Sequence, residues 1–382
     1  MERSPFHILK VCSSSAWGGM EMAAVELGRQ LRERGHRITY LANRHSPTGR
    51  AVEESKLPLL PFSIHGYIDP LGVKKIREWV KKEDVDLVHT HYSKDLWVLA
   101  PALSMGRKKI PLVLTKHIGT MRPKRDFLHR LIYRRVDTVI AISRIIQQNV
   151  IHTHPVPQEK VRTIPNGVDL RRFGLKDVDR KAVRASLGIP QDAVVVGMAG
   201  RLSWWKGYRE FLEMAQRLIR ARSDVFFLAI GGSTVGEEKE ADAILDFARS
   251  QSLDGRIVFT GFREDVDRLY GAMDVFVYPA YAEAFGLVLI EAMASGLPVV
   301  SSNSDGVPEI VVDGRTGRLV RPRDSDALNA AVMEMLENSN TLKEYGRAGR
   351  QRVMELYDIQ KIVDQIEILY GELIARRKCR SD

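Results

Sequence analysis

The sequence predicts an α/β protein with two similar domains, each built around a parallel β-sheet. Its 382 residues exceed the length at which one hydrophobic core usually stops growing, roughly 250 to 300 residues. Short continuous apolar runs alternate with longer segments of helical period, which is typical of buried parallel strands and their connecting helices. A composition of 44% hydrophobic and 28% charged residues is that of an ordinary folded chain.

Ten short apolar runs are the candidate strands, five in each half of the chain. The first five are His7 to Ser13, Arg37 to Ala42, Val85 to Thr90, Leu112 to Lys116 and Thr138 to Ile142. The second five are Ala193 to Ala199, Val225 to Ile230, Arg256 to Thr260, Val275 to Tyr278 and Pro298 to Ser301. Amphipathic segments such as Met20 to Arg34 separate them, so the two halves are expected to be doubly wound in the same way.

The domain boundary is predicted near Phe173. The segment VRTIPNGVDLRRFG, residues 161–174, joins the halves and carries turn residues at its centre. We therefore expect domains at residues 1–172 and 173–357. The last segment, 358–376, has one apolar helical face and is expected to pack back on the first domain; that face is formed by Ile359, Ile362, Val363, Ile366, Leu369 and Leu373.

Several classes of protein are disfavoured by the sequence. The longest apolar stretch, Phe285 to Val300, is interrupted by Glu291 and falls short of the ~20 clean residues that a membrane span needs. The start HILKVCSSS lacks the apolar region of a signal peptide, so a cytoplasmic protein is expected. Cys12 and Cys379 are too few for a disulfide framework or a metal knuckle.

The net charge of +10 is concentrated in one region of the first half. Residues 105–135 hold ten Lys or Arg against one acid, Asp126. An anionic membrane surface suits this basic region better than nucleic acid does, because the region has few interleaved aromatics and no nucleic-acid motif. The alternative, a basic face that serves only solubility, stays open.

The segment GRLSWWKG, residues 200–207, directly follows a predicted strand of the second half. Parallel sheets bind ligands beyond the carboxyl ends of their strands. Arg201 and Lys206 leave such a strand end across a short loop, so both cations can converge on one anion. A diphosphate would suit them, although two cations in a surface loop are common.

The segment AYAEAFGLVLIEAMASG, residues 280–296, places two carboxylates around the expected start of a helix. The free amides of Phe285, Gly286 and Leu287 at such a start form an anion site. Glu283 precedes them, and Glu291 follows in the second turn with its side chain leaning back. Because carboxylates accept hydrogen bonds from hydroxyls, the pair predicts a nucleotide sugar as ligand. A capping glutamate and a solvated one are the alternative.

The segment AEAFGLVLIEAMASGLPVV resembles the E-x7-E region of the retaining glycosyltransferases of family 4, which have the GT-B fold. Other pieces similar to that family occur in its order along nearly the whole chain; they are AWGGME, LVLTKH, IPNGVD, GRLSWWKG, LAIGG, RIVFTGF and DGVPEIVVDGRTGRLV. The resemblance implies two Rossmann-like domains facing across a cleft. It implies that the first domain binds the acceptor and the second the nucleotide sugar.

The resemblance also implies residue roles. Arg201 and Lys206 match the pair that binds the donor diphosphate, and Glu291 matches the ribose ligand. Glu283 matches the acid at the donor sugar, and His117 a histidine near that sugar. The remaining donor-binding positions are Gly18, Gly19, Gly232, Phe262, Arg263, Ala284, Phe285, Gly286 and Leu287. The Trp204-Trp205 pair departs from the family pattern and could border the acceptor or simply pack.

The reaction expected from this resemblance is sugar transfer with retention, from a nucleoside diphosphate sugar to a glycan or lipid-linked hydroxyl. A UDP-sugar is favoured over GDP- or ADP-sugars, and lipopolysaccharide or other envelope polysaccharide synthesis at the inner face of the membrane is the expected setting. No further cofactor, no metal and no nucleic acid are expected; Arg201, Lys206 and the helix amides would stabilise the leaving group. We favour front-face attack over double displacement.

Metal sites and other enzyme classes have weaker support in the sequence. The D-x-D strings precede strands or open helices, and His89-x-His91 lacks an evident third zinc ligand. A nucleotide-sugar epimerase, a phosphorylase with pyridoxal phosphate and a non-catalytic nucleotide-sugar-binding protein remain as alternatives. A dehydrogenase is disfavoured because no G-x-G-x-x-G follows the first strand.

Overall fold

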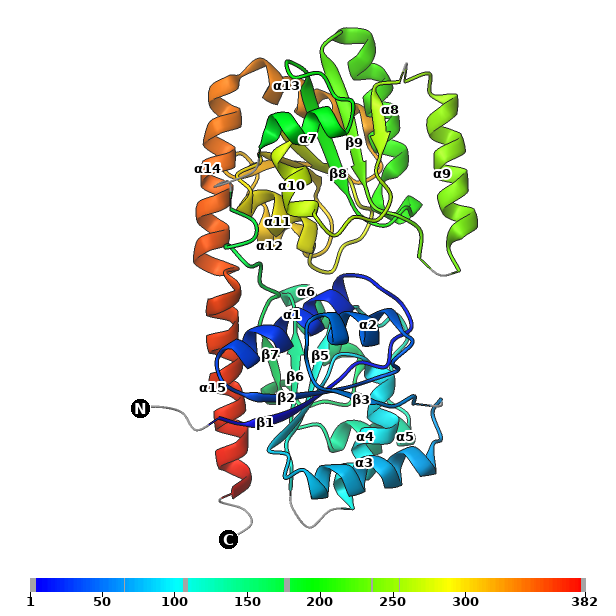
Figure 1. The fold of residues 1–382 in the computed structure, drawn as a ribbon, viewed down its shortest axis with the longest axis vertical. Coiled ribbons are helices and arrows are strands. Elements are labelled where there is room, and N and C mark those ends of the chain that lie inside the picture. Colours follow the sequence, from blue (N-terminus) through cyan, green and yellow to red (C-terminus); the bar gives the residue numbers. More distant parts are fainter. Residues whose placement is uncertain are drawn as a thin grey trace. The chain divides into compact units, whose positions relative to one another are not determined.

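The computed structural model describes residues 5–64, 66–105, 109–174, 179–234, 236–253 and 255–378. Within it the chain forms two compact units (Figure 1). Unit 1 comprises residues 1–166 and 359–382, and unit 2 comprises residues 167–358. The expected boundary at Phe173 lies inside unit 2. Arg107 and Lys108 of the basic region, and Asp177 of one D-x-D string, lie outside the described residues.

Unit 1 is built on a seven-stranded parallel sheet of order β3-β2-β1-β4-β5-β6-β7. The strands are β1 (His7–Val11), β2 (Arg37–Ala42), β3 (Leu59–Pro61), β4 (Leu87–Thr90), β5 (Leu112–Lys116), β6 (Thr138–Ala141) and β7 (Val161–Thr163). The helices are α1 (Gly19–Glu33), α2 (Pro47–Glu54), α3 (Pro70–Lys82), α4 (Leu96–Ser104), α5 (Phe127–Arg134), α6 (Arg144–Thr153) and α15 (Ile359–Lys378).

Unit 2 is built on a six-stranded parallel sheet of order β10-β9-β8-β11-β12-β13. The strands are β8 (Val194–Ala199), β9 (Val225–Ile230), β10 (Ile257–Phe259), β11 (Val275–Tyr278), β12 (Val299–Ser302) and β13 (Gly317–Val320). The helices are α7 (Arg180–Ser186), α8 (Tyr208–Ala221), α9 (Glu238–Ser250), α10 (Val266–Gly271), α11 (Leu287–Ala294), α12 (Val307–Ile310), α13 (Ser325–Glu337) and α14 (Ser339–Leu356).

The predicted fold class, two α/β domains with doubly wound parallel sheets, is confirmed. All ten predicted runs form strands. Three further strands, β3, β7 and β13, were not predicted. β7 and β13 lack the continuous apolar run by which a buried strand is recognised. β3 lies in the apolar run LPLLPF, but Pro58 and Pro61 argue against a strand there. β7 lies in the segment that was interpreted as a junction.

The helix starts follow from local sequence. Several helices begin at a side chain that accepts a hydrogen bond from a backbone amide of the first turn, which satisfies a donor that has no partner within the helix. In unit 1 these caps are Ser46, Asp69, Asp126 and Ser143. In unit 2 they are Asp179, Asp324 and Asn338.

In each unit, helices pack on one face of the sheet and form an apolar core with it. In unit 1, the apolar face of α15 packs with residues of α1 and the sheet, including Leu31, Leu87 and Val113. In unit 2, α8, α9 and α13 cover the sheet through residues such as Phe211, Ile244 and Leu328. Among the described helices, none combines the length and apolar character needed to cross a membrane. The carboxyl ends of the strands are thereby left to the connecting loops, where the candidate site residues lie.

Candidate active site

The loop after β8 holds the two predicted phosphate-binding cations. Arg201 leaves the strand end and is exposed, whereas Lys206 closes the 3-10 turn η4 (Trp204–Lys206) and its side chain is 20% exposed. Gly207 follows with φ of 81°, and a Cβ there would lie 2.2 Å from the Pro279 carbonyl oxygen. Only glycine lets this loop press against the end of β11.

The segment after β11 brings Glu283 to the same place. Lys206 Nζ donates to Glu283 Oε2 at 2.7 Å, and the Tyr278 hydroxyl donates to the same oxygen at 2.5 Å. The Phe285 amide reaches Glu283 Oε1 at 3.4 Å. Burial raises the pKa of Glu283, but the Lys206 charge and these hydrogen bonds outweigh burial and lower it below the ordinary value. Glu283 is therefore a carboxylate at neutral pH.

Tyr278 lies at the centre of this group. The Lys206 ammonium is 5.6 Å from the centre of its ring, and the positive charge of Arg201 lowers the pKa of its phenol. Burial and then Glu283 raise that pKa by more, so the hydroxyl stays protonated and donates. Lys206 and Glu283 thus contact the same tyrosine, whereas the charge of Arg201 acts on it without a direct contact. In the sequence, Tyr278 stands out only as the last residue of a predicted strand.

Helix α11 begins at Leu287, slightly later than expected, with Gly286 as its N-cap. Gly286 has φ of 101°, a conformation that costs other residues strain. Phe285 is buried and stacks edge-on against Tyr357, with ring centres 5.7 Å apart. Ala284 is held by a close approach of Gly306, whose Cβ would meet the Ala284 carbonyl oxygen at 2.3 Å. The first turn of α11 is thereby fixed near Glu283.

Glu291, in the second turn of α11, is half-buried. Burial raises its pKa, while a hydrogen bond from Tyr270 and the charge of Arg172 oppose that shift. The Tyr270 hydroxyl donates to Glu291 Oε2 at 3.0 Å. The two glutamates therefore differ, since the pKa of Glu283 is lowered and that of Glu291 raised. The partners of the two glutamates, Tyr278 and Tyr270, were not predicted. The available signal was a tyrosine within an otherwise apolar stretch, once before and once at the end of β11.

The loops after β9 and β10 complete this edge of unit 2. The Leu202 amide donates to the Gly232 carbonyl at 3.0 Å, and a Cβ on Gly232 would lie 3.2 Å from the Phe262 amide nitrogen. Phe262 is 56% exposed. Arg263 forms a bidentate pair with Asp265, both contacts at 2.7 Å. Gly232, Phe262 and Arg263 thus follow neighbouring strands at the same sheet edge.

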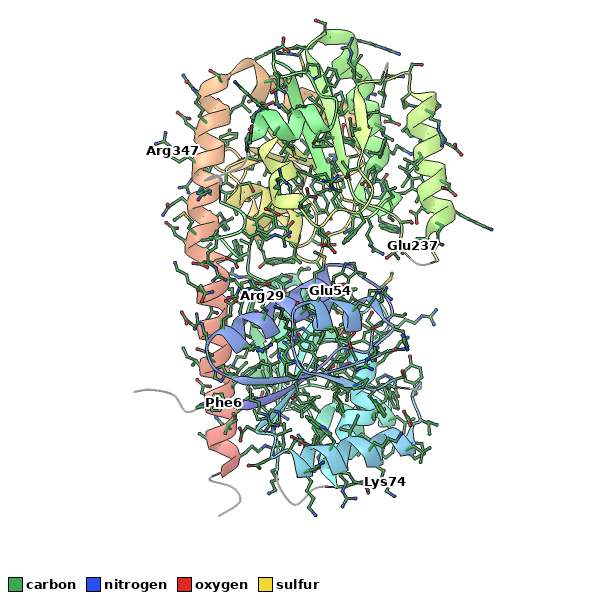
Figure 2. The ribbon with its side chains drawn as sticks, in the orientation of Figure 1. Phe6, Arg29, Glu54, Lys74, Glu237 and Arg347 are labelled. Carbon is green, nitrogen blue, oxygen red and sulfur yellow. The ribbon has the colours of Figure 1, made fainter. Side chains whose placement is uncertain are left out.

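Arg201 already has an acidic partner that the sequence does not predict. Its Nη1 lies 3.0 Å from both carboxylate oxygens of Glu237, which precedes α9 and is labelled in Figure 2. Both side chains are partly exposed, at 43% and 35%. An exposed pair of this kind contributes little to stability. An incoming anion can therefore replace Glu237 at small cost.

The two tryptophans of the η4 loop behave differently. Trp204 packs edge-on against Phe247, and the guanidinium of Arg209 lies 5.1 Å from the centre of its ring. Trp205 is 60% exposed, with its ring centre 6.1 Å from that of Tyr281. Packing therefore explains Trp204, but it does not explain the exposed Trp205.

The predicted residues of unit 1 lie at the carboxyl edge of its own sheet. Gly18 and Gly19 form the start of α1, after β1. His117 follows β5, is 6% exposed, and has its Nε2 3.1 Å from His91 Nδ1. Burial, then Lys10 and Lys116, lower the pKa of His117 to about 3, so its ring is neutral at pH 7.

His89 and His91, considered above as a zinc pair, have ring centres 4.3 Å apart. Within the described ranges, no group of three His, Cys, Asp or Glu residues is arranged to hold a metal ion. His89 instead bonds to Thr115 and Tyr370, at 2.7 and 2.6 Å.

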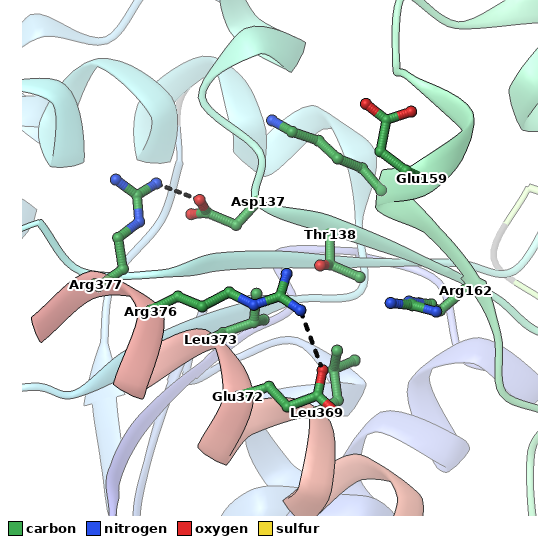
Figure 3. A pocket seen from close by; sticks show the side chains of 10 residues that line it. Asp137, Thr138, Glu159, Arg162, Leu369, Glu372, Leu373, Arg376 and Arg377 are labelled. Carbon is green, nitrogen blue, oxygen red and sulfur yellow. Dashed lines mark hydrogen bonds and ion pairs between the residues drawn. The ribbon is translucent and has the colours of Figure 1, made fainter. Parts of the chain in front are cut away.

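A separate pocket of about 260 Å³ lies in unit 1, at the amino ends of β6 and β7 (Figure 3). Two charge pairs line it: Arg377 bonds to Asp137, and Arg376 lies 3.7 Å from Glu372. It contains none of the predicted site residues.

Two parallel-sheet units with charged loops and glycine turns at the carboxyl edges are the architecture expected of a GT-B glycosyltransferase. The family model described as Glycosyltransferase Family 4 matches residues 17–172, and the one described as Glycosyl transferases group 1 matches residues 179–352. Together they span most of the chain. The protein belongs to glycosyltransferase family 4 and is a glycosyltransferase with the GT-B fold.

Individual relatives agree with this assignment. N-acetyl-alpha-D-glucosaminyl L-malate synthase of Bacillus anthracis is 25% identical over 370 residues, 94% of each chain. D-inositol 3-phosphate glycosyltransferase of Saccharomonospora viridis is 27% identical over 357 residues, 87% of this chain and 80% of the relative. The crystal structure of Anabaena HepE in complex with UDP and glucose is 25% identical with a TM-score of 0.84, covering 96% of this chain and 99% of HepE.

Proposed function

We propose that the protein transfers a sugar from a nucleoside diphosphate sugar to an acceptor hydroxyl, with retention of anomeric configuration. The observation that carries this proposal is the contact of Lys206, Glu283 and Tyr278 beside the start of α11, with Arg201 in the loop that ends at Lys206. It offers two cations to a diphosphate and an ionised carboxylate to sugar hydroxyls. HepE, whose structure contains UDP and glucose, supports a UDP-sugar as donor.

In this proposal the residues have distinct roles. Arg201 and Lys206 bind the diphosphate together with the Gly286 and Leu287 amides at the start of α11, because the Phe285 amide already donates to Glu283. The two cations stabilise the charge of the diphosphate as the sugar–phosphate bond breaks. Glu283 binds the donor sugar and Glu291 the ribose. Gly18 and Gly19 approach the donor through their backbone, His117 lies at the transferred sugar, and Gly232, Phe262 and Arg263 border the base.

Front-face attack is the mechanism that we propose. The bond from the anomeric carbon to the diphosphate oxygen breaks, the bond to the acceptor oxygen forms on the same face, and the leaving oxygen takes the acceptor proton. Glu283 is a poor nucleophile because three donors, Lys206, Tyr278 and the Phe285 amide, already engage its carboxylate. We propose that Arg201 and Lys206 stabilise the leaving diphosphate without a metal ion.

A screen of nucleotide sugars by thermal shift tests the donor. A ligand that binds only the folded protein raises stability by about 2.7 kcal/mol at 100 times its Kd. We expect a UDP-sugar to give the largest shift and Lys206→Met to abolish it, with transfer unaffected by EDTA. If no nucleotide sugar stabilises the wild-type protein, the proposal is wrong. Isomerised sugar from donor alone would instead establish an epimerase.

We further propose that the acceptor is lipid-linked, with lipopolysaccharide-type substrates as the favoured kind, and that unit 1 contacts an anionic membrane. Around α5, five large apolar side chains are more than half exposed; they are Ile118, Met121, Phe127, Leu128 and Leu131. Exposed arginines of the basic region, including Arg122, Arg125 and Arg130, lie among them. Apolar and basic groups side by side are typical of interfacial helices. Lys116 and Arg135 do not belong to this surface, because one is buried and the other pairs with Asp137.

Sedimentation with vesicles tests the membrane contact. The double variant Phe127→Ser, Leu131→Ser should lose binding to anionic vesicles. The control Ile368→Ser, at a 47% exposed position on α15, should keep it. Equal binding to neutral vesicles at low salt would exclude an electrostatic contribution.

A further inference from the structure

Five polar residues share one face of the unit 1 sheet. Lys10 of β1 is in register with His89 of β4, and His91 comes directly after β4. Thr115 lies in β5 and His117 comes directly after it, so both pairs occupy alternating positions. Because alternate residues of a strand face the same side, these side chains lie on the face covered by α15. None of the five is more than 6% exposed. A row of polar groups inside an apolar face calls for an explanation.

Three of these residues form a continuous hydrogen-bonded chain. Lys10 Nζ lies 2.6 Å from His91 Nε2, and His91 Nδ1 lies 3.1 Å from His117 Nε2. Both ring nitrogens of His91 are thereby used, one on each side. His117 uses Nε2 within the chain, which leaves its Nδ1 as the nitrogen that can meet a ligand. His89 stands outside the chain, because its two nitrogens bond to Tyr370 and Thr115.

Both rings of the chain are neutral at pH 7. Burial, then the charge of Lys10, lower the pKa of His91 well below 6.5 and that of His117 to about 3. Burial also lowers the pKa of Lys10 well below 10.5, opposed only by Cys12. A neutral imidazole carries one proton, on either Nδ1 or Nε2, and the hydrogen bond made by one nitrogen decides which.

The chain can run in only two directions. If Lys10 donates to His91 Nε2, the His91 proton is on Nδ1 and is donated to His117 Nε2, so the His117 proton is on Nδ1. If Lys10 accepts from His91 Nε2, every proton is reversed and His117 presents a bare Nδ1. In both cases His91 and His117 have the same tautomer.

We infer that Lys10 is a positioning residue that fixes, through His91, which ring nitrogen of His117 carries the proton. Lys10 thereby decides whether His117 offers the transferred sugar a hydrogen-bond donor or an acceptor at Nδ1. That consequence for the sugar rests on the proposed function. The tautomer itself is a property of the free protein and can be measured without any substrate.

Nitrogen-15 NMR of histidine-labelled protein tests the inference directly. The two ring nitrogens of a neutral histidine have well-separated shifts, and His91→Gln and His117→Gln spectra assign the relevant signals among the ten histidines. We expect His91 and His117 each to populate one tautomer, the same in both. Opposite tautomers, or a mixture in either ring of the wild-type protein, would overturn the inference.

Lys10→Met removes the group that orients the chain while keeping a side chain of similar length. We expect the His91 and His117 signals to move toward those of mixed tautomers. The matched control is Tyr370→Phe, which removes a hydrogen bond from His89 in the same cluster and should leave both signals unchanged. Unchanged signals in Lys10→Met, or equal changes in both variants, would show that Lys10 does not orient the rings.

Activity provides a second measurement. In metal sites, mutation of the partner that fixes a histidine's tautomer lowers metal affinity or activity by about 10- to 100-fold. We expect Lys10→Met to lower kcat/KM for sugar transfer by roughly the same factor. Tyr370→Phe, which leaves the Lys10–His91–His117 chain intact, should keep the kcat/KM of the wild type. If the tautomers shift and kcat/KM does not, His117 has no role at the sugar. If the protein transfers no sugar at all, the proposed function fails and the tautomer result still stands.

Discussion

The carboxyl edges of the two sheets carry positive charge in different ways. In unit 2 each predicted cation has an acid beside it: Lys206 pairs with Glu283 at 2.7 Å and Arg201 with Glu237 at 3.0 Å. In unit 1 Lys10 bonds to a histidine and Lys116 to the Ser93 hydroxyl, at 2.6 and 3.3 Å. In the part of the chain that the structure describes, neither of these two lysines has an ion pair with an acid.

This difference has physical consequences. A buried cation beside a carboxylate stays charged, because the pair offsets the loss of hydration. A buried cation without one is driven toward its neutral form, and burial accordingly lowers the pKa of Lys10 and Lys116. The edge of unit 2 is therefore charged and ordered before any ligand binds. The edge of unit 1 would gain from an arriving anion.

Removal of the Lys206–Glu283 pair should have the largest effect on activity. Lys206→Met deletes a cation that is proposed to stabilise the leaving diphosphate and leaves Glu283 without its main partner. Loss of one such stabilising donor costs about 100- to 1,000-fold in kcat, which is the loss expected in steady-state kinetics. Lys343→Met, at an exposed position of α14, is the control and should retain full activity. A loss below threefold would remove Lys206 from the machinery.

The glycine that places Lys206 should matter for folding. Gly207 and Gly188 both have positive φ, but only Gly207 has the Pro279 carbonyl in the path of a Cβ. Gly188→Ala should cost about 1 kcal/mol of unfolding free energy from backbone strain. Gly207→Ala adds a clash with backbone and should cost roughly 3 kcal/mol or more. Urea unfolding of the two variants measures the difference, and equal costs would show that the loop yields freely.

Lys116 of unit 1, which has no acidic partner among the described residues, should lower the stability of the folded protein at neutral pH, whereas the paired Lys206 should not. Burial, then the charge of Lys124, lower the pKa of Lys116 to about 8, so the folded protein loses its proton there before the unfolded chain does. The unfolded state then binds more protons between about pH 8 and 10.5, and wild-type stability should rise with pH across that window. The gain is at most roughly 3 kcal/mol.

Lys116→Met should therefore be more stable than the wild type at pH 7, with an advantage that shrinks as the pH rises above 8. Lys74→Met, at a 73% exposed position of α3, is the control and should show no such trend. Denaturant unfolding at several pH values decides the matter. If Lys116→Met is less stable than the wild type at pH 7, or if the difference in unfolding free energy does not change with pH, a partner must stabilise the charged form of Lys116.

Much of this architecture could be read from the sequence, because a strand buried on both faces must be a continuous apolar run. Such runs predicted β1 and β11, but β13 has only two adjacent apolar residues, Leu319 and Val320, and prolines interrupt the run around β3. For the site, the rule that ligands lie beyond strand ends selected Arg201, Lys206 and Glu283.

The partners of these residues could not be predicted. Tyr278 and Tyr270 read as ordinary apolar positions in their segments, and their hydroxyls acquire a role only through contacts with Glu283 and Glu291. Glu237 lies far from Arg201 in sequence, and no local pattern links a charge to a partner brought close by folding. Lys10 posed the reverse difficulty, since a lysine inside a strand suggests exposure and gives no sign of the buried histidines beside it.

The two glutamates of unit 2 allow the comparison to be made within one site. The folded-state pKa of Glu283 is below its ordinary 4.5, so its ionised form stabilises the fold above that pH and the contribution is lost as the pH falls further. The pKa of Glu291 is raised, mainly by burial, so its ionisation weakens the fold as the pH rises above 4.5. Glu283→Gln should lower stability at pH 7 by roughly 1 to 3 kcal/mol, and the deficit should fade on acidification. Glu291→Gln, which can still accept from Tyr270, should match or exceed the wild type at pH 7. Thermal unfolding of both variants at pH 4 and pH 7 tests the pair, and a larger loss for Glu291→Gln would show that proximity to a cation does not govern which buried acid this fold tolerates.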